Sequence, residues 1–222
     1  MQAYKKNWDD YWDKNNSWFG RVLELYRKML IANSISYYTN KFFPDSGIFL
    51  EAGSGTSQTS IKIPKKNRKL IALDISKEAL EKTRDIRNMD ERVNADILCL
   101  PFKNSSLDGI WNHGVLEHFS QKRIQNILRE FRRVLKPGSH AVLFWPPKHG
   151  SAQIALNPIE FALNLVMRRK FQLFPDEISK LSCRSEARYI IEKSGLEFVD
   201  VYFNHKDLFT NYAVVCRKPR NL

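Results

Sequence analysis

Cysteine is scarce in this chain and irregularly placed. Only three occur, Cys99, Cys183 and Cys216, and no two of them have the CxxC spacing of a metal or redox motif. An odd number of widely separated thiols argues against a disulfide framework and is typical of reduced, cytoplasmic proteins. We therefore expect a cytoplasmic location and no metal site.

Long apolar runs, repeats and linkers are also absent. No apolar stretch approaches the ~20 residues needed to cross a bilayer. The stretch "MQAYKKNWDDYWDKNN" is polar and aromatic, unlike the apolar segment of a secretory signal. No Gly/Ser-rich or Pro-rich segment divides the 222 residues. We expect a single domain over residues 1–222, without a spanning helix or a secretory leader.

Acidic residues are outnumbered by basic ones. The chain has 24 Asp and Glu against 36 Lys and Arg, a net charge of +12. Such a balance favours an anionic partner: nucleic acid, an anionic membrane face or a phosphorylated substrate. The alternative is a soluble protein that is merely basic. Because 43% of the residues are hydrophobic, the chain can bury a substantial core, which excludes a disordered protein.

Apolar strand patterns alternate with helical ones after residue 47. This alternation predicts a mostly parallel sheet covered by helices on both faces. The last two strands are separated by a short loop, which predicts an antiparallel hairpin. The fold class expected is therefore α/β, a Rossmann-like doubly wound sheet of about seven strands. The expected strands are 48–52, 69–74, 92–96, 107–112, 139–145, 196–203 and 211–218.

Helix signals fall between these strands. Ser76 and Ser120 stand where they would cap helices over 77–89 and 121–135, and "KPG" is expected to end the second. A short helix is expected between the glycines near 55 and Pro64, and another over 185–195. The remaining parts are a helical, aromatic cap (1–46) and a helical insertion (147–183), which flank the core of 47–146 and precede the tail of 184–222.

The stretch "GIFLEAGSGTSQTS" (47–60) holds the first chemical signal. A buried strand ends in Glu51, Gly53 and Gly55, and Asp74 ends the next strand 21 positions after Gly53. Glycines let a ligand approach the backbone, and an acid at that spacing can accept hydrogen bonds from a ribose. The pattern predicts a nucleoside-bearing cofactor; the alternative is a tight strand-to-helix turn with no ligand.

Glu51 bears on which cofactor binds. A carboxylate beside the turn would repel the pyrophosphate of NAD, and position 58, where the dinucleotide fingerprint has a third glycine, is glutamine. A ligand with a ribose at one end and an ammonium or sulfonium at the other suits both acids. S-adenosylmethionine is such a ligand.

Four ordered motifs resemble those of one family. "LEAGSGTS" is similar to the first motif, E/D-x-G-x-G-x-G, of class I S-adenosylmethionine-dependent methyltransferases, with Ser57 in place of the third glycine. "LIALDIS", "NADILCLPFKNSSLDGIWNHGVLEHF" and "LREFRRVLKPGSHAVLFWP" resemble its later motifs. The resemblance is closest to the type-11 methyltransferase domain over residues 47–146. It implies methyl transfer by in-line displacement, with S-adenosylhomocysteine as product.

The resemblance also implies roles for single residues. The carboxylates would bind the methionine end (Glu51), the ribose (Asp74) and the adenine amino group (Asp96), although Asp96 is alternatively a polar residue at a strand end. His113 is either a general base for a hydroxyl acceptor or a residue that shapes the pocket. The implied cofactor contacts are Glu51, Gly53, Gly55, Asp74, Ile75, Asp96, Ile97, Asn112 and His113.

The acceptor is less defined. We expect a small-molecule, sugar or lipid-linked acceptor with an oxygen or nitrogen nucleophile, held by the aromatic N-terminal segment and by the 147–183 insertion. The helix in that insertion, 157–177, is either a lid or a peripheral membrane contact. Alternative functions are an RNA (tRNA) methyltransferase, a non-catalytic nucleoside-binding protein and an NAD-dependent oxidoreductase. The oligomeric state is not predicted.

Overall fold

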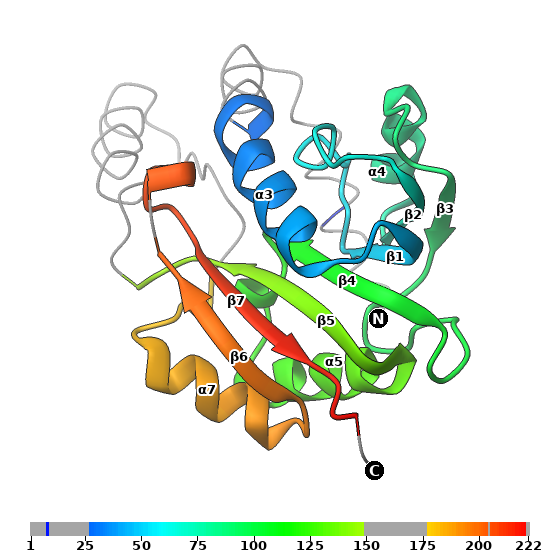
Figure 1. Ribbon diagram of the computed structural model, residues 1–222. Helices are drawn as coiled ribbons and strands as arrows, with labels where there is room; N and C mark the ends of the chain where they lie inside the picture. Colours follow the sequence, from blue (N-terminus) through cyan, green and yellow to red (C-terminus); the bar gives the residue numbers. More distant parts are fainter. Residues whose placement is uncertain (1–7, 9–26, 149–176, 204, 221–222) are drawn as a thin grey trace, which may run out of the picture.

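The computed structural model describes residues 8, 27–148, 177–203 and 205–220. In this part of the chain, seven strands form one sheet in the order β3-β2-β1-β4-β5-β7-β6 (Figure 1). Strands β1 to β5 are parallel, and β7 runs antiparallel to both β5 and β6. The predicted Rossmann-like sheet with an antiparallel C-terminal hairpin is therefore confirmed. The strands are β1 (Ser46–Ala52), β2 (Asn67–Asp74), β3 (Glu91–Asn94), β4 (Leu107–His113), β5 (Leu135–Trp145), β6 (Glu197–Tyr202) and β7 (Tyr212–Arg217).

Helices cover both faces of the sheet, with α3 and α4 on one side and α5 and α7 on the other (Figure 1). Phe49 and Trp111 belong to the core on the α3 side, and Leu50 and Ile110 to the core on the α5 side. The helices are η1 (Arg27–Ile31), α3 (Ala32–Phe42), α4 (Lys77–Lys82), η2 (Thr83–Asp85), η3 (Leu116–His118), α5 (Gln121–Val134), α7 (Arg184–Lys193) and η4 (His205–Asp207). None of the helices in these described ranges has the length and apolar character needed to span a membrane.

The predicted helix α5 forms because its apolar residues recur at helical spacing. Ile124, Ile127, Leu128 and Phe131 are fully buried against the sheet. Two details of the prediction are wrong. Ser120 occupies the N-cap position, but its side chain makes no capping bond. The "KPG" stretch also belongs to β5, which begins four residues earlier than expected, at Leu135.

Other helix predictions on the α3 side also need correction. The helix expected between Gly55 and Pro64 does not form. Instead, three successive turns carry the chain, with the amides of Ser57, Ser60 and Ile63 donating to carbonyls three residues earlier. Serine and threonine dominate this stretch and have low helix propensity because their side chains compete for backbone partners. The helix capped by Ser76 forms as predicted, but ends at Lys82 rather than at 89.

Strand order reverses between β1 and β4, which are neighbours at the centre of the sheet. Ligands in open parallel sheets bind beyond the carboxyl ends of the strands at such a point. The glycine turn follows β1, so it lies at this position. Most of the predicted N-terminal cap and of the 147–183 insertion lies outside the described residues.

Candidate functional site

The glycine turn is held against the tip of β2. The amides of Gly53 and Ser54 both donate to the carbonyl of Leu73, at 2.8 and 2.9 Å. The amide of Gly55 donates to Oδ2 of Asp74 at 2.7 Å. The structure therefore brings three of the predicted site residues together: Gly55 donates to the side chain of Asp74, and Gly53 donates to the residue before it, Leu73.

Backbone conformation explains the residues of this turn. Gly53 has φ +76, and a Cβ there would lie 2.5 Å from Cγ2 of Val115, so only glycine fits. Gly55 has φ +50. Ser57, which replaces the third glycine of the motif, has φ +53. The substituted serine thus keeps the left-handed conformation that glycine adopts most easily.

Glu51 is a buried carboxyl group at the end of β1, only 2% exposed. Its Oε1 accepts a hydrogen bond from Ser60 Oγ at 2.6 Å, and Ser60 in turn accepts one from the indole of Trp111 at 3.0 Å. Among the described residues, its Oε2 has no hydrogen-bond partner. Burial raises the pKa of Glu51 to about 7, despite the hydroxyl groups that favour its charged form, and the charge of Asp74 adds to this increase. A cation beside Oε2 would satisfy this carboxylate.

Asp74 is held rigidly at the end of β2. Besides the bond from Gly55, its Oδ1 accepts the amide of Ser76 at 2.8 Å. Asn94, at the end of β3, donates its side-chain amide to the carbonyls of Asp74 and Ile75 at 3.0 and 2.9 Å. The tips of β2 and β3 are thereby fixed together, and Ile75 is half-buried beside the acid. Asn94 was not predicted as a site residue.

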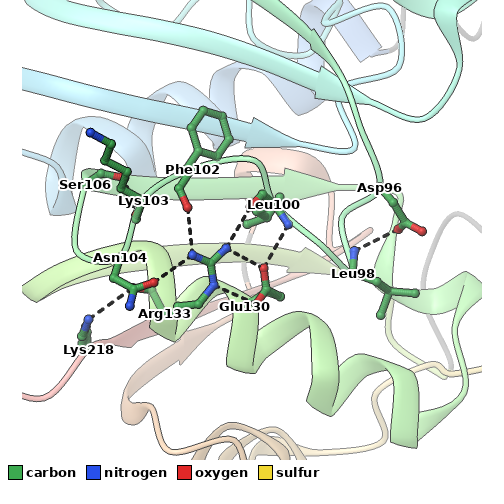
Figure 2. Close-up of polar contacts among 10 residues, drawn as sticks. All are labelled: Asp96, Leu98, Leu100, Phe102, Lys103, Asn104, Ser106, Glu130, Arg133 and Lys218. Atoms are coloured by element: carbon green, nitrogen blue, oxygen red, sulfur yellow. Dashed lines mark hydrogen bonds and ion pairs between the residues drawn. The ribbon is translucent and has the colours of Figure 1, made fainter.

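The loop after β3 carries Asp96 and Ile97. Asp96 Oδ1 accepts the amide of Leu98 at 2.9 Å, which orients the carboxyl group, and Ile97 is buried. Figure 2 shows how α5 anchors this loop: the guanidinium of Arg133 donates to the carbonyls of Leu100 and Phe102, both at 2.8 Å. The sequence analysis missed Arg133, although the residue lies within the fourth quoted motif.

The end of β4 places two predicted residues on opposite faces of the sheet. His113 lies on the same face as Glu51, since Trp111, two residues earlier, is paired with Glu51. Asn112 therefore points to the other face, where it is fully buried and both side-chain amide atoms lack a partner. The Asn112 amide is an unsatisfied polar group at the switch point, consistent with a ligand or water beside it.

His113 is a weaker base than the sequence suggested. The ring packs edge-on near Phe144, with centroids 6.4 Å apart. Burial, and secondarily the charge of Arg27, lowers the pKa of His113 to about 3. The imidazole is therefore neutral near pH 7 and takes up a proton only reluctantly. Of the two roles considered for His113, shaping the pocket agrees better with this environment.

Glu117, in η3, is also buried. Burial raises the pKa of its carboxyl group to about 8, and its Oε2 has no partner. Its carbonyl accepts the amides of Ile178 and Ser179, at 2.6 and 2.9 Å, which joins the C-terminal part of the predicted 147–183 insertion to this loop. The neighbouring His118 ring meets Trp8 edge-on at 5.0 Å. This contact packs at least one N-terminal aromatic residue against the loop after β4.

Taken together, the described residues fit a cationic nucleoside. A buried carboxylate with a free oxygen and a glycine turn lie at the tip of β1, and a rigid aspartate lies at the tip of β2. A third acid follows β3. This is the donor and acceptor set that a ribose, an adenine and a charged amino-acid end require. No group of three His, Cys, Asp or Glu suited to a metal ion occurs among the described residues.

Comparisons with known proteins agree with this fit. Residues 50–143 match the family model described as "Methyltransferase domain". Malonyl-[acyl-carrier protein] O-methyltransferase of Erwinia pyrifoliae is 35% identical over 102 residues, which are 46% of this chain and 38% of that protein. The chain thus spans well under half the length of this curated relative.

Two solved structures share the fold at low sequence identity. Magnesium protoporphyrin IX methyltransferase from Synechocystis PCC 6803, solved with bound S-adenosylhomocysteine, has a TM-score of 0.66 at 12% identity, covering 98% of this chain and 99% of the other. A S-adenosylmethionine-dependent methyltransferase from Methanosarcina mazei has a TM-score of 0.61 at 15% identity, covering 82% and 97%. The family model over residues 50–143 supports a class I S-adenosylmethionine-dependent methyltransferase domain in this chain, and the strand order and these two structures agree with the fold of such a domain.

Proposed function

We propose that the protein transfers the methyl group of S-adenosylmethionine to an oxygen or nitrogen of a small-molecule, sugar or lipid-linked acceptor. The observation that carries this proposal is the buried Glu51 carboxyl group, whose Oε2 has no partner at the tip of β1. A binding site for a neutral or anionic cofactor gives no reason for such a group. The three cysteines, all unpaired, support a cytoplasmic location.

The proposal assigns a role to each acid. Glu51 receives the positively charged methionine end, and Asp74, oriented by two backbone amides, binds the ribose hydroxyls. Asp96 accepts the adenine amino group, with Ile75 and Ile97 packing on the ring. Backbone around Asn112 and His113 faces the reacting end. When bound, the cofactor supplies a methyl group already activated by the positive charge on sulfur.

Positioning is the main contribution expected from the protein. Holding a nucleophile in line with the methyl group can lower a barrier by about 7–11 kcal/mol at best. A neutral His113 near the mouth can orient a donor hydrogen of the acceptor without removing its proton. The proposal therefore requires no catalytic base among the described residues.

An RNA substrate is less well supported by the charge distribution. The basic stretch "KIPKKNRK" (62–69) leads into β2 and includes its first three residues, at the opposite end of the strands from the glycine turn. Lys65, Lys66 and Lys69 are paired with Asp90, Asp45 and Glu91, respectively. These lysines mostly neutralise the protein's own acids. The NAD-dependent alternative is disfavoured by Glu51, which would face a pyrophosphate.

Mass spectrometry of the native purified protein tests the cofactor directly, because tightly held S-adenosylmethionine or S-adenosylhomocysteine would co-purify. A labelled methyl donor is then offered with a panel of carboxylic acids, phenols, amines, sugars, tRNA and a malonyl-acyl carrier protein, the last because of the curated relative. Label transfer to a small or lipid-linked acceptor supports the proposal. Transfer to tRNA alone, or binding of NADH in preference to S-adenosylhomocysteine, contradicts it.

A further inference from the structure

The connection between β6 and β7 lies at the functional edge of the sheet. Strand β6 runs parallel to β5, so its carboxyl end and the following residues 203–211 lie at the edge that carries the glycine turn. Figure 1 shows η4, within this connection, beside α3. Helix η4 also contacts η1, whose Arg27 acts on the pKa of His113. These elements therefore border the acceptor side of the site.

Apolar side chains are exposed on these elements. Seven large apolar side chains are exposed in the described residues, and five of them occur here, at 40–55% exposure. The other two are Ile178 and Tyr189. We call the five the rim patch: Met29, Tyr37, Phe203, Leu208 and Phe209. Exposed apolar residues gathered on adjoining elements indicate a binding surface more strongly than the same residues scattered singly.

The conformation of the loop fixes two of these side chains outward. Leu208 and Phe209 have φ +57 and +58, an unfavourable conformation for residues other than glycine, here in two successive positions. The loop is held by Asp207, whose Oδ2 accepts the amide of Asn211 at 3.1 Å. Phe209 also packs against Phe203, with centroids 5.3 Å apart. The backbone of the turn at Leu208 and Phe209 is thus held in a fixed conformation, with both side chains exposed.

The charges around the rim patch are almost all positive. Helix η1 and the connection between β6 and β7 contain Arg27, Lys28 and Lys206, and their one acid, Asp207, is buried. Lys41 lies at the other end of α3, where it lines a pocket with Asp108 and Gly138. The ammonium group of Lys206 lies 4.1 Å above the ring of Tyr37, which joins the basic and apolar parts of the surface. An anionic surface with an apolar interior complements this combination.

We propose that the rim patch docks on an anionic lipid bilayer, with Leu208 and Phe209 entering the interfacial layer. Nucleic acid fits less well, because the aliphatic side chains of Met29 and Leu208 cannot stack on bases as aromatic residues do. Docking in this orientation turns the site toward the membrane. If the proposed methyl transfer is correct, the acceptor is an amphiphile whose reactive group lies at the headgroup level; the docking itself does not depend on that activity.

Co-sedimentation with vesicles tests the docking without any assay of activity. The full chain is mixed with vesicles of phosphatidylcholine alone or of equal parts phosphatidylcholine and phosphatidylglycerol. We expect binding only to the anionic vesicles, weakened by added salt. Lys206→Glu should lower the partition coefficient at least about fivefold, and Leu208→Ser with Phe209→Ser by about tenfold or more.

Matched controls come from the opposite side of the molecule. Tyr189, on α7, is also exposed and lies beneath a lysine, Lys193, at 5.6 Å. Tyr189→Ser and Lys193→Glu should leave vesicle binding unchanged. Thermal melting of each variant shows whether it is folded. If the double variant Leu208→Ser with Phe209→Ser does not fold, the surface variant Lys206→Glu still tests the proposal. Absence of binding to anionic vesicles at low salt, or equal loss in the control variants, overturns the proposal. Binding to an acidic carrier protein or to tRNA, without binding to anionic vesicles, also overturns the proposal.

Discussion

Glu51 is the residue whose environment is hardest to explain without a ligand. Its carboxyl group is buried, one oxygen has no partner, and its pKa is raised to about 7. A bound cation would favour the charged form and restore the pKa toward its ordinary value. The raised pKa follows from burial, and it predicts that binding of a cationic cofactor is coupled to loss of the Glu51 proton.

Glu51→Gln should weaken S-adenosylhomocysteine binding about 10- to 100-fold, since it removes a charge-assisted hydrogen bond to the ligand ammonium. In the unmodified protein, the dissociation constant should also rise as the pH falls below about 7, by up to about tenfold per pH unit, because Glu51 must lose its proton. The variant should lack this dependence. Titration calorimetry on both sides of neutral pH measures this, with Glu192→Gln, an exposed acid of α7, as the control. Equal pH dependence in both variants would contradict the role of Glu51.

Stability should fall as the pH rises from about 7 to about 8.5. The pKa values of Glu51 and Glu117 are raised by burial from 4.5 to about 7 and about 8, so the folded state holds protons that the unfolded state has lost. The contribution of His113, whose pKa is lowered to about 3, is nearly constant in this window. The expected loss is about 1.5 kcal/mol. Denaturant unfolding across this window measures it, and Glu117→Gln should remove most of the slope. A flat or rising profile would refute the assignment.

At this scale the sequence predicted residue types better than their chemistry. Glu51, Gly53, Gly55 and Asp74 could be found because strand ends and spacing bring them together. The low pKa of His113 could not, since it depends on burial and on Arg27, which lies far away in the sequence. The roles of Glu51, Gly53, Gly55, Asp74 and His113 in cofactor binding stay predictions.

Among the elements, the glycine turn departs most from sequence expectation. A helix was expected after Gly55, but the chain makes successive turns stabilised by Ser60 and the backbone, and Ser57 adopts φ +53. Long periodic elements such as α5 were predictable because burial of one face decides them. The conformation of this turn depends on the hydrogen bond to Asp74 and on packing against Val115. Local helix propensity carries no information about these tertiary contacts.

Two glycine variants separate backbone strain from packing. Gly53 and Gly114 have similar conformations, φ +76 and +70, but a Cβ on Gly53 meets Val115 at 2.5 Å, whereas one on Gly114 meets nothing closer than Glu117 at 4.0 Å. Gly53→Ala should therefore cost about 1–3 kcal/mol more stability than Gly114→Ala. Chemical denaturation of both measures the difference. Equal losses would mean that Val115 does not close on the turn.

The whole molecule is basic, but its basic residues differ in how many acidic residues lie near them. Lys65, Lys66 and Lys69 are paired with acids of the same chain. Around the rim patch, η1 and the connection between β6 and β7 carry Arg27, Lys28 and Lys206, and their one acid, Asp207, is buried. The mostly parallel sheet of about seven strands could be predicted from the alternation of patterns along the chain, because crossover connections are right-handed and short. Helix α3 forms within the predicted N-terminal cap, but most of the cap and most of the predicted lid lie outside the described residues, so their roles remain predictions.

This distribution predicts weak tRNA binding. In gel shifts at about 0.15 M salt, Lys65→Gln with Lys66→Gln should change tRNA affinity by less than about twofold, since both lysines already have intramolecular partners. A steep salt dependence with a large loss in this double variant would indicate a nucleic-acid surface and revive the RNA alternative.

We propose that carboxylates at the tips of β1 and β2 hold a nucleoside with a positively charged amino-acid end. Calorimetric titration of the full chain with S-adenosylhomocysteine, with NADH in parallel and with Asp74→Ala as the site variant, tests this binding mode. We expect saturable binding of S-adenosylhomocysteine, no binding of NADH, and loss of S-adenosylhomocysteine binding in an Asp74→Ala variant that still unfolds cooperatively. Undiminished binding in Asp74→Ala, or preference for NADH, would contradict it.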